Sequence, residues 1–113
     1  MAACFEIARE SDGRYRISLQ GEQGDCLLRS EPLPTRAAAL GALDALRQHG
    51  ALDARYGRLS ARDGSPYFTL KAGNGQVLAQ SPRFRGARAR DEGIAQAQRL
   101  VAQAPVRDLN PEP

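Results

Sequence analysis

Tryptophan is absent from this chain of 113 residues, which contains only one histidine and two cysteines. One histidine with Cys4 and Cys26 cannot supply the four ligands of a structural zinc site. No apolar run approaches the roughly 20 residues that cross a bilayer, and the N-terminus lacks the basic and hydrophobic regions of a signal peptide. These absences predict a cytoplasmic protein with no membrane segment, metal or cofactor. Cys4 and Cys26 are expected to be free thiols, with a disulfide as the alternative.

Lysine is nearly absent as well, because Lys71 is the only one and arginine supplies almost all of the positive charge. Lysine and arginine together number 16 against 13 aspartates and glutamates, which gives a formal net charge of +3. Arginine suits phosphate binding through its planar set of donors, but a GC-rich genome also favours arginine codons. With 42 % hydrophobic residues, the chain has enough apolar material for a single folded domain over 1–113.

The chain does contain an internal sequence repeat with two copies. Asp12-Gly13 recurs as Asp63-Gly64, an offset of 51 residues (63 minus 12). The same offset, without a gap, relates Ile17 to Phe68, Gln23-Gly24 to Asn74-Gly75, Cys26 to Val77, Ser30 to Ser81, Leu33 to Phe84 and Leu43 to Ile94. Two copies of one supersecondary unit explain this, at about 4–54 and 55–109, with a loose tail at 110–113. Because Val77 is its equivalent, Cys26 is expected to be a small buried hydrophobe.

Each copy predicts three strands and a helix. In the first copy, apolar and polar residues alternate near 5–7 and 15–20, a third strand covers 25–29, and Thr35 is a suitable N-cap for a helix that ends at His49. In the second copy, strands are expected at 55–60, 66–71 and 76–80, a helix at 87–102 and a short strand at 106–109. A sheet covered by helices gives an α+β fold.

The turns carry the strongest local signals. Asp12-Gly13, Asp63-Gly64 and Asn74-Gly75 are typical of hairpin loops, because glycine reaches positive φ and Asp or Asn side chains bond the nearby backbone. We expect Asn74-Gly75 to form a two-residue turn with positive φ at both residues. Asp12 and Asp63 are interpreted as turn residues rather than as paired catalytic carboxylates.

The second copy carries a family signature. Its stretch 67–81, with Leu-Lys-Ala-Gly-Asn-Gly-Gln-Val-Leu-Ala-Gln-Ser at its end, and Gly93-Ile94 in the following helix resemble the YegP-like family, small bacterial proteins built on a domain of unknown function. The first copy departs from this signature. Gln20-Gly21-Glu22-Gln23-Gly24 stands where Lys-Ala-x-Asn-Gly is expected, and Ala42-Leu43 replaces Gly-Ile.

The resemblance covers about 5–109 and implies more than the periodicity does. It implies two tandem strand-strand-strand-helix-strand units that share one antiparallel sheet, with the helices packed on one face. The strand after each helix would be exchanged between units, so that 55–60 closes the first unit and opens the second. Single-unit relatives form the same body as homodimers, so this chain resembles a fused dimer and is expected to be a monomer.

Nothing in the chain predicts an enzyme, and the resemblance supplies no catalytic residues. His49 lies at a predicted helix end without a matched nucleophile, and its repeat equivalent is Leu100, so a structural or solvated role is expected. Gly73-Asn74-Gly75 joins two strands and therefore lacks the strand-to-helix context of a phosphate loop.

Two basic groups are candidates for binding a polyanion. On the polar face of the predicted sheet, cations flank an aromatic residue, as on platforms for single-stranded nucleic acid; these residues are Arg14, Arg16, Tyr67 and Lys71. The alternative is an ordinary solvated sheet face. The second group comprises Arg83, Arg85, Arg88 and Arg90. It lies at a predicted helix N-terminus, where cations oppose the helix dipole unless a bound anion or acids such as Asp91 compensate.

Two functions follow as hypotheses. The first is a non-catalytic bacterial domain that acts through contacts with an unknown protein partner. The alternative is weak binding of nucleic acid or another polyanion through the two basic groups, since a net charge of +3 is low for a dedicated nucleic-acid binder.

Overall fold

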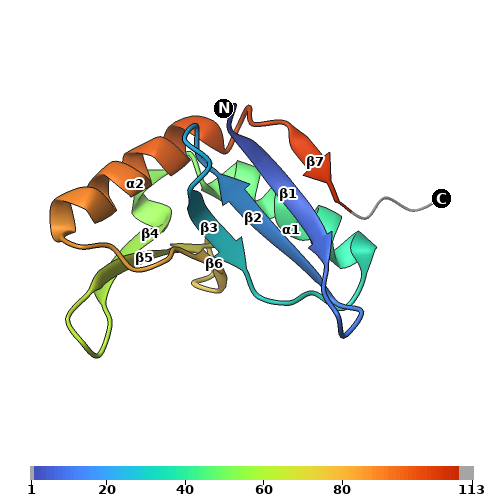
Figure 1. Ribbon diagram of the computed structural model, residues 1–113, viewed down its shortest axis with the longest axis horizontal. Coiled ribbons are helices and arrows are strands. Elements are labelled where there is room, and N and C mark those ends of the chain that lie inside the picture. Colours follow the sequence, from blue (N-terminus) through green and yellow to red (C-terminus); the bar gives the residue numbers. More distant parts are fainter. Residues whose placement is uncertain (1, 110–113) are drawn as a thin grey trace.

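In the part of the chain that the structure describes, seven strands form one mixed sheet in the order β4-β5-β6-β3-β2-β1-β7 (Figure 1). The computed structural model describes residues 2–109, so the predicted loose tail at 110–113 lies outside the described residues. The elements, in chain order, are β1 (Cys4–Arg9), β2 (Tyr15–Gln20), β3 (Cys26–Ser30), α1 (Arg36–His49), a 3₁₀ turn (Asp53–Arg55), β4 (Tyr56–Ser60), β5 (Pro66–Lys71), β6 (Val77–Gln80), α2 (Ala87–Leu100) and β7 (Val106–Asp108).

The sheet consists of two similar antiparallel meanders joined in the middle. One is β1-β2-β3 and the other is β4-β5-β6. They meet where β3 pairs antiparallel with β6, with Arg29 opposite Gln80 and Ser30 opposite Ala79. Because Arg29 and Gln80 are repeat equivalents (80 minus 29 is 51), the junction has the character of a two-fold axis.

The prediction of a wholly antiparallel sheet is wrong at one edge. β7 runs parallel to β1, from the pair Phe5 and Val106 to the pair Ile7 and Asp108. The physical reason is that β7 follows a helix, and a helical crossover allows a strand to return parallel to its neighbour. β7 thus belongs to the second segment of the chain but pairs with the first. At the opposite edge, β4 follows α1 and, among the described residues, pairs with β5 alone.

Both helices cover the same face of the sheet. The Thr35 side chain accepts a hydrogen bond from the Ala38 amide at 3.0 Å, which fixes the start of α1 as predicted. One continuous core forms between helices and sheet, and its largest buried side chains include Phe5, Ile17, Leu46, Phe68 and Ile94. Within residues 2–109, no helix has both the length and the apolar character needed to cross a membrane.

The hairpin loops at 10–14, 21–25, 61–65 and 72–76 have the same pattern of backbone hydrogen bonds. The prediction of a two-residue turn at Asn74-Gly75 is therefore wrong. The Gly75 amide donates to the Ala72 carbonyl at 2.9 Å, and the Ala72 amide donates to the Gln76 carbonyl at 2.8 Å. This is a type I turn closed by a glycine in the left-handed region, a three-residue loop. Gly75 has a φ of 90°, whereas no described residue other than glycine has a positive φ. Asn74 instead accepts a hydrogen bond from the Gln76 amide at 3.0 Å.

A pair of buried serines closes the sheet on either side of the junction. The Ile17 amide donates to Ser30 Oγ and the Phe68 amide donates to Ser81 Oγ, each at 2.9 Å. Each hydroxyl in turn donates to the carbonyl of the residue that follows it, at 2.9 Å for Ser30 and 2.8 Å for Ser81. The repeat therefore extends to individual hydrogen bonds.

Candidate interaction surfaces

The cations singled out in the sequence do not gather at one place. Arg16 lies on β2, whereas Tyr67 and Lys71 lie on β5, and β3 and β6 separate these strands. Three strand spacings amount to roughly 14 Å. Arg14 precedes β2, and the arginines from Arg83 to Arg90 lie in the loop after β6 and in the first turn of α2. The eight residues thus form separate groups rather than one platform.

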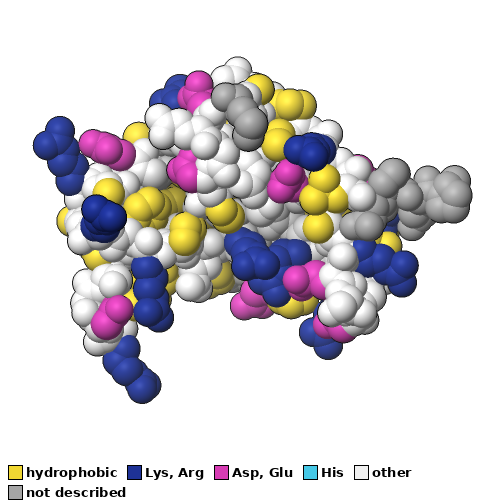
Figure 2. All heavy atoms as spheres, in the orientation of Figure 1, with side chains coloured by type: hydrophobic (Ala, Val, Ile, Leu, Met, Phe, Trp, Pro, Cys, Tyr) yellow, Lys and Arg dark blue, Asp and Glu magenta, His cyan; other side chains and the backbone are white. Residues whose placement is uncertain are grey.

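Acidic side chains pair with most of these cations. The ion pairs are Arg14–Asp12 at 3.7 Å, Arg16–Glu10 at 3.0 Å, Arg83–Asp63 at 3.6 Å, Arg88–Glu92 at 3.3 Å and Arg90–Asp91 at 3.1 Å. Within residues 2–109, the Lys71 and Arg85 side chains form no hydrogen bond or ion pair. Figure 2 accordingly shows basic and acidic side chains interspersed across this view rather than an unbroken basic surface.

The side chains of the two repeated aspartates form hydrogen bonds within their own turns. Asp12 Oδ1 accepts a hydrogen bond from the Arg14 amide, and Asp63 Oδ1 accepts one from the Ser65 amide, each at 3.0 Å. The bond from Ser65 holds the pKa of Asp63 below its ordinary value. Gly13 and Gly64 follow with φ of 88° each. These carboxylates therefore stabilise the conformations of their loops.

His49, at the end of α1, has a local partner. Its Nδ1 accepts a hydrogen bond from Arg55 Nε at 3.3 Å. Within the described residues, no group of three or more His, Cys, Asp or Glu side chains is placed to hold a metal ion. The contact of His49 is thus with the 3₁₀ turn that leads into β4.

A cleft of about 420 Å³ opens at the β3–β6 junction, and residues from both repeats line it. It lies on the helix-free face, because Arg29 and Ser18 are paired there while Leu19 and Leu28 face the core. Its apolar walls include Cys26, Val77, Pro32 and Pro82. The sequence did not predict this cleft, because only the pairing of β3 with β6 brings its walls together. The equivalence of Arg29 and Gln80 was the available signal.

Polar groups at the cleft differ in how far they are already engaged. Arg16 Nε donates to Glu10 Oε1 at 3.0 Å and its Nη1 donates to the Ser30 carbonyl at 3.3 Å. Arg29 is exposed, and within residues 2–109 its side chain forms no hydrogen bond or ion pair. Arg16 is therefore held in place, whereas Arg29 is available.

Cys26 is half-buried at the cleft rather than fully buried as predicted, because it lies on the helix-free face opposite Gln20. Burial raises the pKa of the Cys26 thiol. A neutral thiol is a weak nucleophile, so Cys26 contributes apolar surface. Both cysteines are free.

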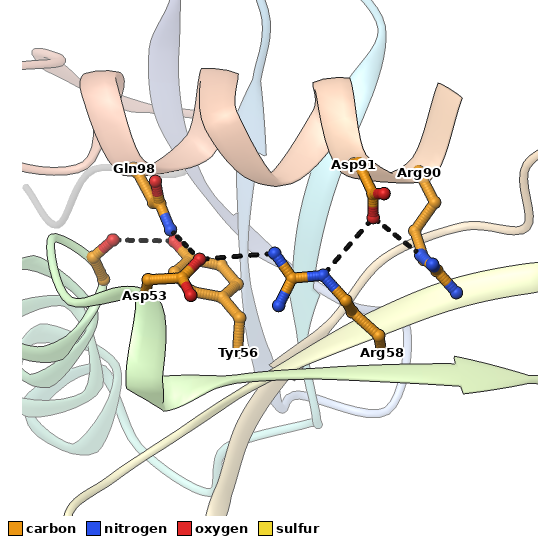
Figure 3. A network of polar contacts seen from close by, with 7 residues as sticks. Asp53, Tyr56, Arg58, Arg90, Asp91 and Gln98 are labelled. Carbon is orange, nitrogen blue, oxygen red and sulfur yellow. Dashed lines mark hydrogen bonds and ion pairs between the residues drawn. The ribbon is translucent and has the colours of Figure 1, made fainter. Parts of the chain in front are cut away.

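A polar network ties β4 to α2 (Figure 3). Arg58 donates from Nη2 to Asp53 Oδ1 and from Nε to Asp91 Oδ1, both at 3.3 Å. Gln98 Nε2 donates to Asp53 Oδ1 at 2.8 Å, and this bond more than Arg58 holds the pKa of Asp53 below its ordinary value. Arg58 occupies the repeat position of buried Ile7 (58 minus 51 is 7). At this edge of the sheet, ion pairs of Arg58 therefore replace the buried apolar contacts that Ile7 makes in the first copy.

Tyr56 anchors the same strand from the inside. Its hydroxyl donates to the Gly50 carbonyl at 2.8 Å, at the end of α1. Burial raises the pKa of Tyr56 well above its ordinary value, with Asp53 adding to the effect. The start of β4 is therefore fixed to α1, and its middle is fixed to α2.

The backbone of β4 is open on one side. Phe68 faces β6, because its carbonyl accepts from the Ser81 amide at 2.8 Å. Arg58 is the partner of Phe68 in β4, so alternation in an antiparallel pair directs the Arg58 amide and carbonyl away from β5. At the other edge, the equivalent groups of β1 are bonded to the chain around β7: the Phe5 amide donates to the Pro105 carbonyl at 2.8 Å, and the Leu109 amide donates to the Ile7 carbonyl at 2.9 Å.

Comparison with known proteins identifies relatives over nearly the whole chain. Residues 61–108 match a family model described as a domain of unknown function (DUF1508). A UPF0339 protein of Acinetobacter baylyi is 36 % identical over 109 residues, which are 96 % of this chain and 98 % of the relative. The chain belongs to the UPF0339 family. Another UPF0339 member, YegP of Escherichia coli O157:H7, is 34 % identical over 95 residues, 84 % of this chain and 86 % of the relative.

Solved structures of UPF0339 relatives share the fold. The solution structure of a UPF0339 protein from Shewanella oneidensis has a TM-score of 0.89 at 27 % identity and covers 96 % of this chain and 92 % of that chain. The solution structure of yegP from E. coli has a TM-score of 0.90 at 29 % identity, covering 100 % and 97 %. The YegP-like resemblance is thereby confirmed. The UPF0339 family has an unknown function and no catalytic assignment.

Proposed function

We propose that this UPF0339 protein is a non-catalytic module that binds an extended segment of a partner protein along the open edge of β4. The proposal rests on a difference between the two edges of the sheet. β7 covers β1, whereas the repeat-equivalent side of β4 has no strand beside it within residues 2–109. Addition of a strand to such an edge is a common mode of peptide recognition, in which the backbone supplies affinity.

The covered edge indicates the direction of the bound segment. β7 lies parallel to β1, and the repeat equivalents of Phe5 and Ile7 in β4 are Tyr56 and Arg58. The Tyr56 amide already donates to the Asp53 carbonyl within the 3₁₀ turn. A parallel segment would therefore begin its pairing at the Tyr56 carbonyl and continue to the amide and carbonyl of Arg58.

Charge indicates the chemistry of the partner. Asp108 of β7 forms an ion pair with Arg36 at the start of α1. On the repeat-equivalent side of the sheet, Arg58 of β4 contacts Asp91 of α2, and Arg88, whose side chain is 94 % exposed, lies in the first turn of the same helix. An acidic residue in the bound segment would meet these guanidiniums, so the occupant that fits is an extended acidic peptide.

The ion pairs that Arg58 forms with Asp53 and Asp91 favour a monomer in the absence of that partner. Charged side chains and short strands at sheet edges limit edge-to-edge association between copies. β4 has only five residues, and Arg58 covers its helix side. A partner would have to displace exposed ion pairs, each worth about 0–1 kcal/mol, which its own carboxylate can replace.

Selection of peptides from a random phage-displayed library, followed by NMR mapping, tests the proposal. We expect selected peptides to carry an acidic residue and to shift the amides of Gly57, Arg58 and Leu59. Arg58→Ala and Arg58→Pro both remove the guanidinium, but only proline removes the outward amide, so binding should fall further in the proline variant. Shifts confined to another surface, or concentration-dependent dimers that use β4, would contradict a partner peptide as the occupant.

Weak polyanion binding is the second candidate, supported by Lys71 and Arg85, whose side chains have no ion-pair partner among residues 2–109. Four or five phosphate contacts by single-stranded nucleic acid would give a log–log salt slope of about −3, or a loss on the order of 60-fold in affinity from about 50 to 200 mM salt. Fluorescence anisotropy with a labelled oligothymidine measures this slope. Loss of binding in an Arg16, Tyr67 and Lys71 triple variant would assign the sheet face, and loss in an Arg83, Arg85 and Arg88 variant would assign the loop. No binding at low salt removes this candidate.

A further inference from the structure

We propose that the cleft at the β3–β6 junction is a binding site for a small aromatic monocarboxylate. This site is distinct from the β4 edge and does not depend on the proposed peptide binding. Its volume of about 420 Å³ lies within the range typical of small-molecule sites. Residues of both repeats form it, so neither repeat alone contains it.

A free cation supplies the first element of recognition. Arg29 is exposed on the helix-free face and, within residues 2–109, its side chain has no hydrogen-bond or ion-pair partner. Gln80 lies directly across from it in the register of β3 and β6. A guanidinium beside an amide group provides several donors at one place, and a guanidinium can bind a carboxylate through two parallel hydrogen bonds.

The charge balance favours one negative charge on the ligand rather than several. Arg16 is already neutralised by Glu10 at 3.0 Å, and Glu31 lies at the cleft as well. Of the two guanidiniums at the cleft, Arg16 is therefore paired, whereas Arg29 has no ion-pair partner within residues 2–109. A polyphosphate would meet these acids, because like charges in close proximity are unfavourable. A single carboxylate needs only Arg29.

Apolar walls indicate the rest of the ligand. Pro32 and Pro82, which are separated by 50 residues in the chain (82 minus 32), both line the cleft, with Cys26 and Val77. The Val77 side chain is an exposed large hydrophobic group on this face. A planar apolar ring would cover this surface and can stack on a guanidinium as well. An aromatic ring with one carboxylate therefore matches both the walls and the cation.

Titration of the 15N-labelled protein with phenylacetate tests the proposal, with benzyl alcohol and pyrophosphate as comparison ligands. We expect phenylacetate to shift amides of β3 and β6 and to bind more tightly than either comparison ligand. Arg29→Gln should weaken phenylacetate binding by at least about tenfold, because it removes a charge-assisted hydrogen bond. Arg62→Gln, at an exposed arginine of the loop between β4 and β5 and outside the cleft, should leave the affinity unchanged.

Three results would overturn the site. Equal binding of benzyl alcohol would mean that the carboxylate is not recognised, and equal binding of pyrophosphate would mean that charge alone attracts the ligand. Absence of saturable shifts in β3 and β6 at the solubility limit of phenylacetate would show that the cleft does not bind this class. The spectra of the variants also report whether they remain folded, so loss of binding is separable from loss of structure.

Discussion

Single side chains decide how the strands of this UPF0339 protein are closed, and the buried serines are the clearest case. Ser81 is 5 % exposed, and its hydroxyl takes the place of a backbone acceptor for the Phe68 amide. Ser30 does the same for Ile17 in the first half of the sheet. Their recurrence in the sequence is therefore explained by a shared hydrogen-bonding task.

We expect Ser81→Ala to lower the free energy of unfolding by about 1–3 kcal/mol, because it leaves a buried amide without an acceptor. Urea denaturation measures the change. Ser60→Ala is the matched control, since Ser60 is exposed in β4, and it should have almost no effect. Equal stabilities of the two variants would contradict the role assigned to the Ser81 hydroxyl.

The glycine at the third loop position supports a prediction of a different kind. Gly75 has a φ of 90° and open space around it, so a larger residue is disfavoured by its backbone conformation and not by a collision. Gly75→Val should cost about 1–3 kcal/mol of stability. Gly73→Ala, in the same loop without a positive φ, should cost much less. Thermal unfolding compares them, and equal melting temperatures would refute this account of the loop.

Asp63 gives the protein a defined response to acid. Its pKa is lowered in the folded state by the Ser65 amide, so its contribution to stability is present above the ordinary pKa and is lost as pH falls through the lowered value. Asp63→Asn keeps an acceptor but cannot titrate. The stability difference between parent and variant should therefore change only below about pH 4. A difference that is constant from neutral pH to pH 2 would rule out this linkage.

At the scale of elements, the helices differ where they cross the sheet. A Cβ atom on Gly93 of α2 would lie 2.9 Å from Phe84 Cζ and 3.3 Å from Phe68 Cε2. In the first copy, Ala42 stands at the equivalent position and the smaller Leu33 replaces Phe84. The Gly-Ile pair of the family signature is thus a consequence of the phenylalanine beneath it.

We expect Gly93→Ala to destabilise the protein by about 1–3 kcal/mol through overpacking, and Phe84→Leu to reverse part of that loss. A double-mutant cycle in urea measures this coupling. Gly41→Ala in α1, where a Cβ meets nothing within 4 Å, is the control and should stabilise by up to about 1 kcal/mol. Additive effects of Gly93→Ala and Phe84→Leu would show that the two residues do not constrain each other.

Sequence periodicity predicted these elements well where the signal is local. The helix start at Thr35 and the strand at 66–71 agree with α1 and β5, because capping and alternation depend on neighbouring residues. Two features depended on the context and were predicted wrongly. Asn74 has no positive φ because the loop contains three residues, and β7 lies parallel to β1 because α2 carries the chain across the sheet.

At the scale of the whole molecule, the candidate surfaces also depend on contacts that the sequence alone does not predict. The sequence indicated which arginines are present, but not that Arg16 is neutralised by Glu10 or that Arg29 lies free beside Gln80. These contacts join residues of different strands or different repeats. Only the pairing of β3 with β6 creates the cleft, and only the strand order reveals that β4 is an open edge.

Arg47 links the repeats through hydrogen bonds to residues 54 and 57 positions later in the sequence. From α1 it donates to the Val101 carbonyl at 3.1 Å and to the Ala104 carbonyl at 2.8 Å, at the end of α2, and it lies 5.0 Å from the centre of the Phe5 ring. Arg47 of the first half therefore caps the end of α2, and Tyr56 of the second half bonds to the Gly50 carbonyl at the end of α1. This arrangement predicts one cooperative unit.

We expect unfolding in urea to give coincident transitions by tyrosine fluorescence and far-ultraviolet circular dichroism, at a midpoint independent of protein concentration. The concentration independence follows if the protein is a monomer. Separately expressed halves, 1–54 and 55–113, should not fold as stable monomers. Two resolved transitions, or a stable isolated half, would show that the halves are independent domains.

The parallel pairing of β1 with β7 also determines how the molecule would respond to a pulling force. The chain enters β1 at Cys4 and leaves β7 at Asp108, at opposite ends of this pair, since parallel strands run in the same direction. Tension applied through the two termini would slide the strands past each other and load their hydrogen bonds together, whereas tension across the β4–β5 hairpin would open its bonds one after another. The protein should therefore resist stretching by its ends more than its small size suggests, and optical-tweezers measurements with the two attachment geometries would compare the rupture forces.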